Sequence, residues 1–442
     1  MSSIYLSNFS YLFVPFTTEK LENFPDFCKK ITTEHGWAPV ETENRYLHRY
    51  VADRISNHGD DRSFHFQLTQ DHAECCGLHL GTQPYSTEPK DSGEEPATGY
   101  TFQISNVELY AFDTAIGILV FELRFPENDP FKIASAQYYL RKISTEKIHA
   151  VGLSENPSKE SFVDISSRIL EACSDGLDLD FFFYATPGNE KANFLTYIDV
   201  PKQNNYDKEL FYLKWCYNGN FDYDGDDCDE DSVNYAATQC TIWGISAAAA
   251  VCLVHRSEQQ QHFIETVFQK NFRNQYLLTY ILLLHQKYMM YLFLTKLSIG
   301  LQGNLGQLRK YKEMLYHFET QYMFSNVSEI PQYQRFYSKV RNIFALNQLF
   351  SDVKEPLLQL AQMEKQQAES EQQKHDQRIN TALTTLSLLT IVSALADASG
   401  ITANLGWLIS PQLSKIIQSV SLIGVIVFSA IVFYRLIFPK KR

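Results

Sequence analysis

The C-terminal end of the chain constrains its fold more than any other part. A polar, glutamine-rich segment, Leu357–Arg378, runs directly into an apolar segment, Thr381–Ala403, and a second apolar segment, Ile416–Phe438, follows a short loop. A helix needs about 20 apolar residues to cross the hydrocarbon layer of a bilayer. We therefore predict two C-terminal transmembrane helices, spanning residues 381–438, fed by a long helical stalk and followed by a basic cytoplasmic tail at 439–442.

The length, net charge and cysteine content of the chain limit the number of domains and the kinds of partner that we expect. With 442 residues, the chain has room for one or two soluble domains before the stalk, at about 150 residues per domain. The net charge of −12 argues against binding to nucleic-acid phosphates and favours accumulation of cations near the surface. The eight cysteines include no CxxC pair and are typical of reduced thiols. Met1–Phe16 lacks a basic start, so we predict no signal peptide.

Residues 1–254 are predicted to form an α+β cytoplasmic domain with a mostly antiparallel sheet, because strand and helix patterns are mixed there. The predicted strands are Ile4–Pro15, Ser63–Leu68, Thr101–Phe112, Ile116–Phe125, Asp180–Ala185 and Ala192–Asp199. The predicted helices are Thr18–Thr32, Pro130–Lys142 and Lys159–Cys173. Asp113-Thr114-Ala115 is a hairpin signal between two of these strands.

Residues 255–380 are predicted to be a helical unit that ends in the stalk. Gln275–Leu294 is strongly apolar but is interrupted at its centre by His285-Gln286-Lys287, which favours a buried helix over a third span. Gln307–Tyr322 and Tyr333–Phe350 are amphipathic helix candidates, and Pro356 suits the first turn of the stalk or a kink. The stalk is rich in helix-forming residues and polar on nearly all faces. It is either an exposed linker or coiled coil, or one of several helices around a hydrated vestibule.

Thr381–Ala403 is the less apolar of the two predicted spans, because Ala, Ser, Thr and Asp397 interrupt it. Its polar residues are satisfied if copies of the helix gather around a wet axis, so we predict a homo-oligomer in contact with membrane lipid. At a spacing of about 3.5 residues, the predicted pore-lining stripe is Asn380, Thr384, Ser387, Ile391, Ala394 and Ala398. A competing stripe, Thr390, Ser393 and Asp397, lies about a quarter turn away.

Two clusters have the residue types of metal sites. Asp222, Asp224 and Asp226 begin an acidic run of the kind that Mg²⁺ and Ca²⁺ prefer, although the run also suits a solvated loop. His72, Cys75, Cys76 and His79 have a spacing compatible with zinc, or belong to a packed strand or loop. The chain has no P-loop, no GxGxxG and no GxSxG motif, so we do not expect an enzyme.

The order of a cytosolic α+β domain, a helical unit, one very long helix, two terminal spans and a basic tail resembles the CorA family of two-span divalent-cation channels. The resemblance implies a pentameric channel or transporter for Mg²⁺ or another divalent cation in the bacterial inner membrane. Basic residues before the first span and after the second imply that both termini are cytoplasmic.

The family's Gly-Met-Asn signature at the end of the first span is missing, since the corresponding text is Gly400-Ile401-Thr402-Ala403-Asn404. Asp397, Gly400 and Asn404 are therefore predicted to form a cruder cation-attracting pore mouth. Some CorA-like proteins without the signature resemble effectors of type III CRISPR antiviral defence, in which a nucleotide messenger opens the pore. A small nucleotide ligand is thus the alternative expectation, and a membrane-anchored scaffold without a pore is the third.

Overall fold

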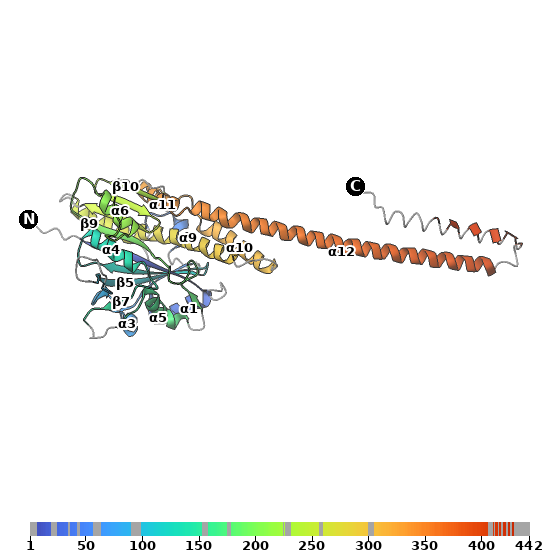
Figure 1. Ribbon diagram of the computed structural model, residues 1–442, viewed down its shortest axis with the longest axis horizontal. Helices are drawn as coiled ribbons and strands as arrows, with labels where there is room; N and C mark the ends of the chain where they lie inside the picture. Colours follow the sequence, from blue (N-terminus) through green and yellow to red (C-terminus); the bar gives the residue numbers. More distant parts are fainter. Residues whose placement is uncertain are drawn as a thin grey trace, which may run out of the picture. The chain divides into compact units, whose positions relative to one another are not determined.

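The chain divides into two compact units, Met1–Leu358 and Gln359–Arg442, in the computed structural model. The residues that the structure describes are 7–18, 24–33, 36–41, 45–55, 63–89, 99–152, 158–174, 178–223, 225, 231–255, 260–298, 305–404, 410, 412–413, 415–416, 419–420, 423–424 and 427. The first unit holds all of the sheet, and the second holds most of one long helix (Figure 1).

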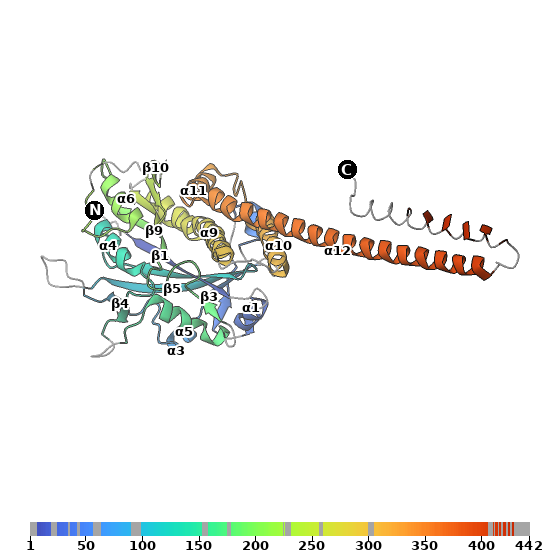
Figure 2. The same ribbon diagram turned by 45° about the vertical axis from the view of Figure 1, so that its right-hand side comes forward.

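Strands and helices are mixed along the first unit (Figures 1 and 2). The strands are β1 (Asn8–Thr18), β2 (Trp37–Pro39), β3 (Ser63–Leu68), β4 (Pro84–Thr87), β5 (Thr101–Phe112), β6 (Ile116–Arg124), β7 (Ile148–Ala150), β8 (Leu179–Asp180), β9 (Asn193–Val200), β10 (Ser232–Thr238), β11 (Thr241–Ser246) and β12 (Ala249–His255). The helices are α1 (Phe24–Thr33), α2 (Arg49–Ala52), α3 (Gln70–Cys75), α4 (Pro130–Leu140), α5 (Phe162–Ser174), α6 (Asp207–Trp215), α7 (Gln261–Phe263), η2 (Ile264–Phe268), α8 (Gln269–Asn271), η3 (Phe272–Tyr276), α9 (Leu277–Ser298), α10 (Leu305–Tyr322), α11 (Pro331–Ile343) and α12 (Leu346–Asn404), where η marks π-helical turns.

A 12-stranded mixed sheet organises the first unit. Its main order is β10-β11-β12-β9-β1-β6-β5-β3-β2, with β4, β7 and β8 attached beside this path. β12 and β9 run parallel, while β1 pairs antiparallel with both β6 and β9. The hairpin between β5 and β6 turns at Ala115, whose φ of 65° is in the left-handed region. β1, β6 and β9 are therefore central strands with neighbours on both sides.

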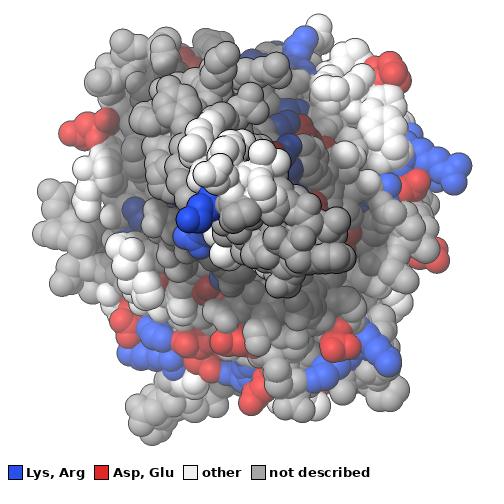
Figure 3. Space-filling view, turned by 90° about the vertical axis from the view of Figure 1, so that its right-hand side faces the viewer, with Lys and Arg blue, Asp and Glu red and all other residues white. Residues whose placement is uncertain are grey.

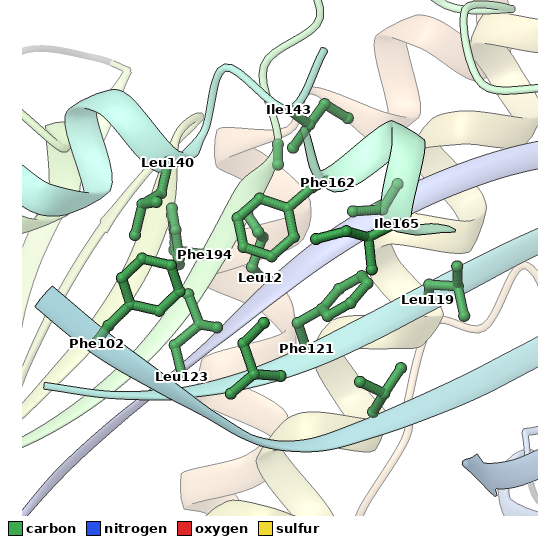
Figure 4. Packing of buried hydrophobic residues seen from close by; sticks show 14 of the residues in the cluster. Leu12, Phe102, Leu119, Phe121, Leu123, Leu140, Ile143, Phe162, Ile165 and Phe194 are labelled. Atoms are coloured by element: carbon green, nitrogen blue, oxygen red, sulfur yellow. The ribbon is translucent and has the colours of Figure 1, made fainter. Parts of the chain in front are cut away.

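One face of the sheet packs against α1, α4, α5 and α6. Leu12, Phe121 and Leu123 point toward this side and are completely buried. Figure 4 shows them against Leu140 of α4 and Phe162 of α5. Because alternate side chains of a strand point to opposite faces, the residues between these three must be covered by a second layer of helices.

The second layer is formed by the helical run from α7 to α9 together with α11. Phe13, the neighbour of Leu12, has its ring centroid 5.3 Å from that of Tyr280. The Trp243 ring of β11 lies 5.7 Å from Phe272 and 4.6 Å from Phe336, so aromatic contacts join the sheet to two helices. Aromatic pairs at such separations contribute about 0.5–1.5 kcal/mol each beyond their buried area.

The predicted fold class, an α+β domain with a stalk and two C-terminal transmembrane helices, is wrong. The sheet is mixed and has 12 strands. Within the described residues, one helical run, Gln261–Leu297, is long and apolar enough to cross a membrane, and it is a core helix because 89 % of its most apolar stretch is buried. Thr381–Ala403 belongs to the last part of α12, and its many Thr, Ser and Ala residues lower its mean hydropathy. The second predicted span, Ile416–Phe438, lies largely outside the described residues.

Several individual elements agree with the sequence patterns. Ser63–Leu68 and Thr101–Phe112 are confirmed as β3 and β5 with the same bounds. The strand predicted at Asp180–Ala185 is wrong, since β8 ends at Asp180 and the backbone N–H of Ala185 closes a turn onto the carbonyl of Phe182. Most of the predicted helix Tyr333–Phe350 is helical, but it is divided between α11 and α12 by Ala345, which has a φ of 49°.

Charged side chains of both signs are interspersed on the face seen in Figure 3. Described Lys and Arg residues alternate there with Asp and Glu residues. Among the described residues of that face, the acidic side chains are therefore separated by basic ones.

Candidate functional site

The residues predicted to line a pore all lie on α12. This helix has 59 residues, which corresponds to a length of about 88 Å. It begins inside the first unit, ten residues before the predicted start at Pro356, and Leu346, Val353 and Leu357 are buried there. Lys354 Nζ donates to Oε1 of Glu319 on α10 at 2.6 Å. The first three turns of α12 are thus fixed by apolar and ionic contacts.

The stalk part of α12 is polar all round. Every side chain from Lys365 to Asn380 is exposed. Lys365 and Glu369 form an i,i+4 ion pair at 3.9 Å, a geometry that supports an exposed helix by a few tenths of a kcal/mol. The linker and the vestibule interpretations of this segment both stay predictions.

Beyond the stalk, α12 becomes amphipathic. Three apolar side chains at i, i+4 and i+7 form one stripe, and three polar side chains with the same spacing form another. The apolar stripe is Ile379, Leu383 and Leu386, and the polar stripe is Asn380, Thr384 and Ser387. Each polar residue follows an apolar one directly, so the stripes are about 100° apart around the helix. The apolar side chains are 44, 57 and 64 % exposed, and large apolar side chains at i, i+4 and i+7 normally face a partner.

The four threonines in this segment satisfy their hydroxyl groups within the helix. Thr381, Thr384, Thr385 and Thr390 each donate to the carbonyl oxygen four residues earlier, at 2.8, 2.6, 2.8 and 2.6 Å. Because the backbone carbonyl accepts the hydrogen bond, the hydroxyl does not have to donate one to water. The segment can therefore be placed against an apolar surrounding without leaving these donors unpaired.

The remaining predicted pore residues lie in the last part of α12. Ile391 belongs to the predicted lining stripe and is 39 % exposed. Ala394, Ala398 and the predicted mouth residues Asp397, Gly400 and Asn404 have helical backbone within α12, while their side chains lie outside the described residues. The competing stripe through Thr390 and Ser393 also stays open.

The predicted zinc cluster does not form a metal site among the described residues. His72 and Cys75 are on α3, not on the strand or loop that was the alternative to zinc, and Thr69 caps that helix by accepting from the His72 backbone N–H. His72 Nε2 lies 3.7 Å from Cys76 Sγ, and His79 makes its contact through its backbone N–H to the Tyr85 hydroxyl. No group of three His, Cys, Asp or Glu residues in the described part of the chain is arranged for a metal ion.

The acidic run lies largely outside the described residues. Asp222 is exposed. Asp224 and Asp226 lie outside the described residues. A weak divalent-cation site there stays a prediction from the sequence.

The polar interruption of α9 serves a role that the sequence did not indicate. His285, Gln286 and Lys287 are all buried. His285 Nε2 lies 2.7 Å from Thr114 Oγ1 in the β5–β6 hairpin, and burial lowers the pKa of His285 to about 3. Gln286 Nε2 donates to the carbonyl of Tyr322 at 2.5 Å. His285 and Gln286 therefore connect α9 to two separate neighbours, the β5–β6 hairpin and the end of α10.

A charged network on the sheet was also missed. Burial alone would raise the pKa of Glu108, but hydrogen bonds from His65 and Tyr110, both at 2.9 Å, lower it. Arg273 Nη1 donates to Glu122 and, at 3.2 Å, to the hydroxyl of Tyr11. The signal that could have revealed it is the strand alternation that puts Glu108 and Tyr110 on the same face of β5.

Comparison with known proteins adds no relative: no protein-family model, no curated protein and no solved structure matches this chain.

Proposed function

We propose that the protein is an oligomeric membrane channel for cations, in which copies of α12 surround a common path. The observation that carries the proposal is the amphipathic segment from Ile379 to Thr390, with exposed Leu383 and Leu386 on one side and Asn380, Thr384 and Ser387 on the other. The resemblance to the CorA-like family supports the same assembly and suggests five copies.

The free energy gained by burying apolar side chains favours a partner for the apolar stripe of α12. Full burial of a Leu or Ile side chain contributes about 1.5–3 kcal/mol, so Ile379, Leu383 and Leu386 together favour association strongly enough to offset part of its entropic cost. A ring of identical helices covers these side chains with lipid or with the next copy. The polar stripe is then left facing the centre, where water and ions satisfy it.

The negative net charge of the chain and the oxygen atoms of the polar stripe suit the passage of cations. The chain has a net charge of −12, and an oligomer multiplies this charge around one axis. An acidic surface raises the local concentration of cations and speeds their arrival. The hydroxyl and amide oxygens of the polar stripe are oxygen ligands of the kind that hard cations prefer.

Reconstitution of the full-length protein in a planar bilayer tests the proposal. We expect discrete cation conductance, and we expect Ser387→Lys to reduce it because the ammonium would lie in the path. Thr385→Lys is the matched control, since residue 385 is about 160° around the helix from residue 387. A protein that is monomeric by light scattering, or that gives no conductance under any ionic condition, would contradict the proposal. Conductance that appears only after a nucleotide is added would favour the messenger-gated form.

A further inference from the structure

β10 lies at one end of the main sheet order and pairs with β11 only (Figure 1). All seven of its residues are at least partly exposed, whereas β11 and β12 beside it are almost completely buried. About half of the backbone N–H and C=O groups of an edge strand point away from its neighbour. Within the described part of the chain, the backbone of β10 makes no hydrogen bonds except those with β11.

The residues of β10 do not block pairing at this edge. Edge strands of natural proteins are usually short, or carry Lys, Pro or inward-pointing charges that prevent another strand from adding. The sequence Ser-Val-Asn-Tyr-Ala-Ala-Thr contains no Pro and no charge, and residues 232–236 pair with β11 in a regular register. The strand at the other end of the order, β2, has three residues and ends in Pro39. Of these two edges, β10 is therefore the one that can accept a further strand.

Two basic side chains of α11 lie beside this edge. Tyr235 of β10 is paired with Trp243, whose ring centroid lies 4.6 Å from that of Phe336, so α11 covers this face of the sheet. Lys339 Nζ lies 5.0 Å from the centroid of the Tyr235 ring. Burial raises the pKa of Tyr235, and the guanidinium of Arg335 is close enough to oppose this effect. Arg335 and Lys339 are four residues apart and therefore lie on the same side of α11.

Neither cation has a carboxylate partner among the described residues. Lys339 contacts the Tyr235 ring instead of an acidic group, and Arg335 forms no ion pair. Arg335 is exposed and Lys339 is half-buried. Because Tyr235 belongs to the edge strand, charges that reach its side chain lie next to the line along which a further strand adds. The side chains of such a strand would meet both cations.

We propose that β10 binds an extended, acidic peptide segment of a partner protein, which adds to the sheet as a further strand. Main-chain hydrogen bonds to β10 supply affinity, and the basic side chains of α11 supply selectivity for acidic residues. Successive side chains of a strand point to opposite faces. Acidic residues at every second position therefore all lie on the face that α11 covers, next to Arg335 and Lys339. This surface belongs to the first unit and does not depend on the channel proposal.

Fluorescence anisotropy of the full-length protein with a labelled peptide of alternating Glu and Val residues tests the site. The peptide has seven residues, the length of β10, and we expect saturable binding. The same peptide with Lys in place of Glu should bind about tenfold more weakly, because it brings like charges to Arg335 and Lys339. N-methylation of either the Glu or the Val amides should abolish binding in one case only, since one of these two sets faces β10.

Arg335→Glu/Lys339→Glu should reverse the preference, so that the Lys peptide binds more tightly than the Glu peptide. Lys365→Glu/Lys374→Glu is the matched control, because it makes the same change of net charge at exposed positions of α12. This control should keep the preference of the wild type. The peptide comparisons use wild-type protein, so they test the site even if the first double variant does not fold. No saturable binding at millimolar Glu peptide, an unchanged preference in folded Arg335→Glu/Lys339→Glu, or equal binding of both N-methylated peptides would overturn the proposal.

Discussion

The ammonium group of Lys287 lies 4.5 Å from the centroid of the Phe344 ring. Lys287 is in the middle of α9, and Phe344 immediately precedes Ala345, the left-handed residue from which α12 starts. Lys287 Nζ also donates to Asn193 Oδ1 of β9 at 3.2 Å. One buried cation thus joins the sheet to the corner between α11 and α12.

The stability of the protein should rise with pH because of Lys287. Burial and the nearby Arg141 guanidinium lower the pKa of Lys287 from 10.5 to about 7. Between these values the unfolded chain holds a proton that the folded chain has released, so the free energy of unfolding increases with pH, by at most about 1.4 kcal/mol per pH unit. Lys287→Met should remove this rise. The measurement is the urea midpoint at several pH values between 7 and 10.

Lys365→Met is the control for this prediction. It makes the same change at an exposed position of α12, where Lys365 is paired with Glu369. We expect the wild-type pH slope in this variant. Identical slopes in wild type and Lys287→Met would show that Lys287 does not release its proton on folding.

His285 should make the protein sensitive to acid. Its pKa is lowered by burial from 6.5 to about 3, so between these values the unfolded chain binds a proton that the folded chain does not. The free energy of unfolding should therefore fall as the pH falls, by at most about 1.4 kcal/mol per pH unit from this residue. The double variant His285→Leu/Thr114→Val, which removes both partners of the 2.7 Å contact, should show a shallower fall between pH 6 and 4. Thermal unfolding across this range measures it, and an unchanged slope would contradict the assignment.

Gly117 of β6 is required by the Phe16 ring of β1. The two residues are paired in register, and a Cβ at Gly117 would lie 2.2 Å from Cζ of Phe16. Gly117→Ala should destabilise the protein by about 1–3 kcal/mol, as expected for overpacking of a core. The denaturation midpoint measures this change. Phe16→Leu should cost less in the Gly117→Ala background than in wild type, and additive effects would argue against the contact.

The sequence was most informative where the pattern is local. Apolar and polar residues alternate in Thr101–Phe112, and Ile116–Arg124 is rich in β-favouring residues. The two segments flank a turn, so β5 and β6 were predictable. Ser232–His255, which supplies β10 to β12, was not assigned to strands, because its many alanines are a weak strand signal. The parallel pairing of β12 with β9 depends on contacts between distant segments, which local pattern does not encode.

Periodicity indicated one helix correctly but gave no sign of two other features of the helices. The apolar text of Gln275–Leu294 correctly indicated a buried helix, because both faces of that helix are covered by protein. The π turns of η2 and η3 follow from a spacing of four in the buried residues, which resembles an ordinary helical pattern. The sequence does not indicate the helix break at Ala345, because neither Gly nor Pro is present there.

The apolar stripe of α12 should control the oligomeric state. Leu383→Gln/Leu386→Gln replaces two side chains that are 57 and 64 % exposed, and so removes apolar area without disturbing the first unit. Because each Leu contributes about 1.5–3 kcal/mol when fully buried, we expect the double variant to shift the assembly toward smaller species, measured by light scattering coupled to size exclusion.

Thr381→Gln/Thr385→Gln is the matched control, with the same number of glutamines introduced on a different side of the helix. These threonines are already polar and donate within α12, so we expect the wild-type mass. If both double variants dissociate equally, helix propensity and not the apolar stripe determines assembly. If neither changes the mass, the subunits associate through another surface, and α12 would not be the element that gathers them around an axis.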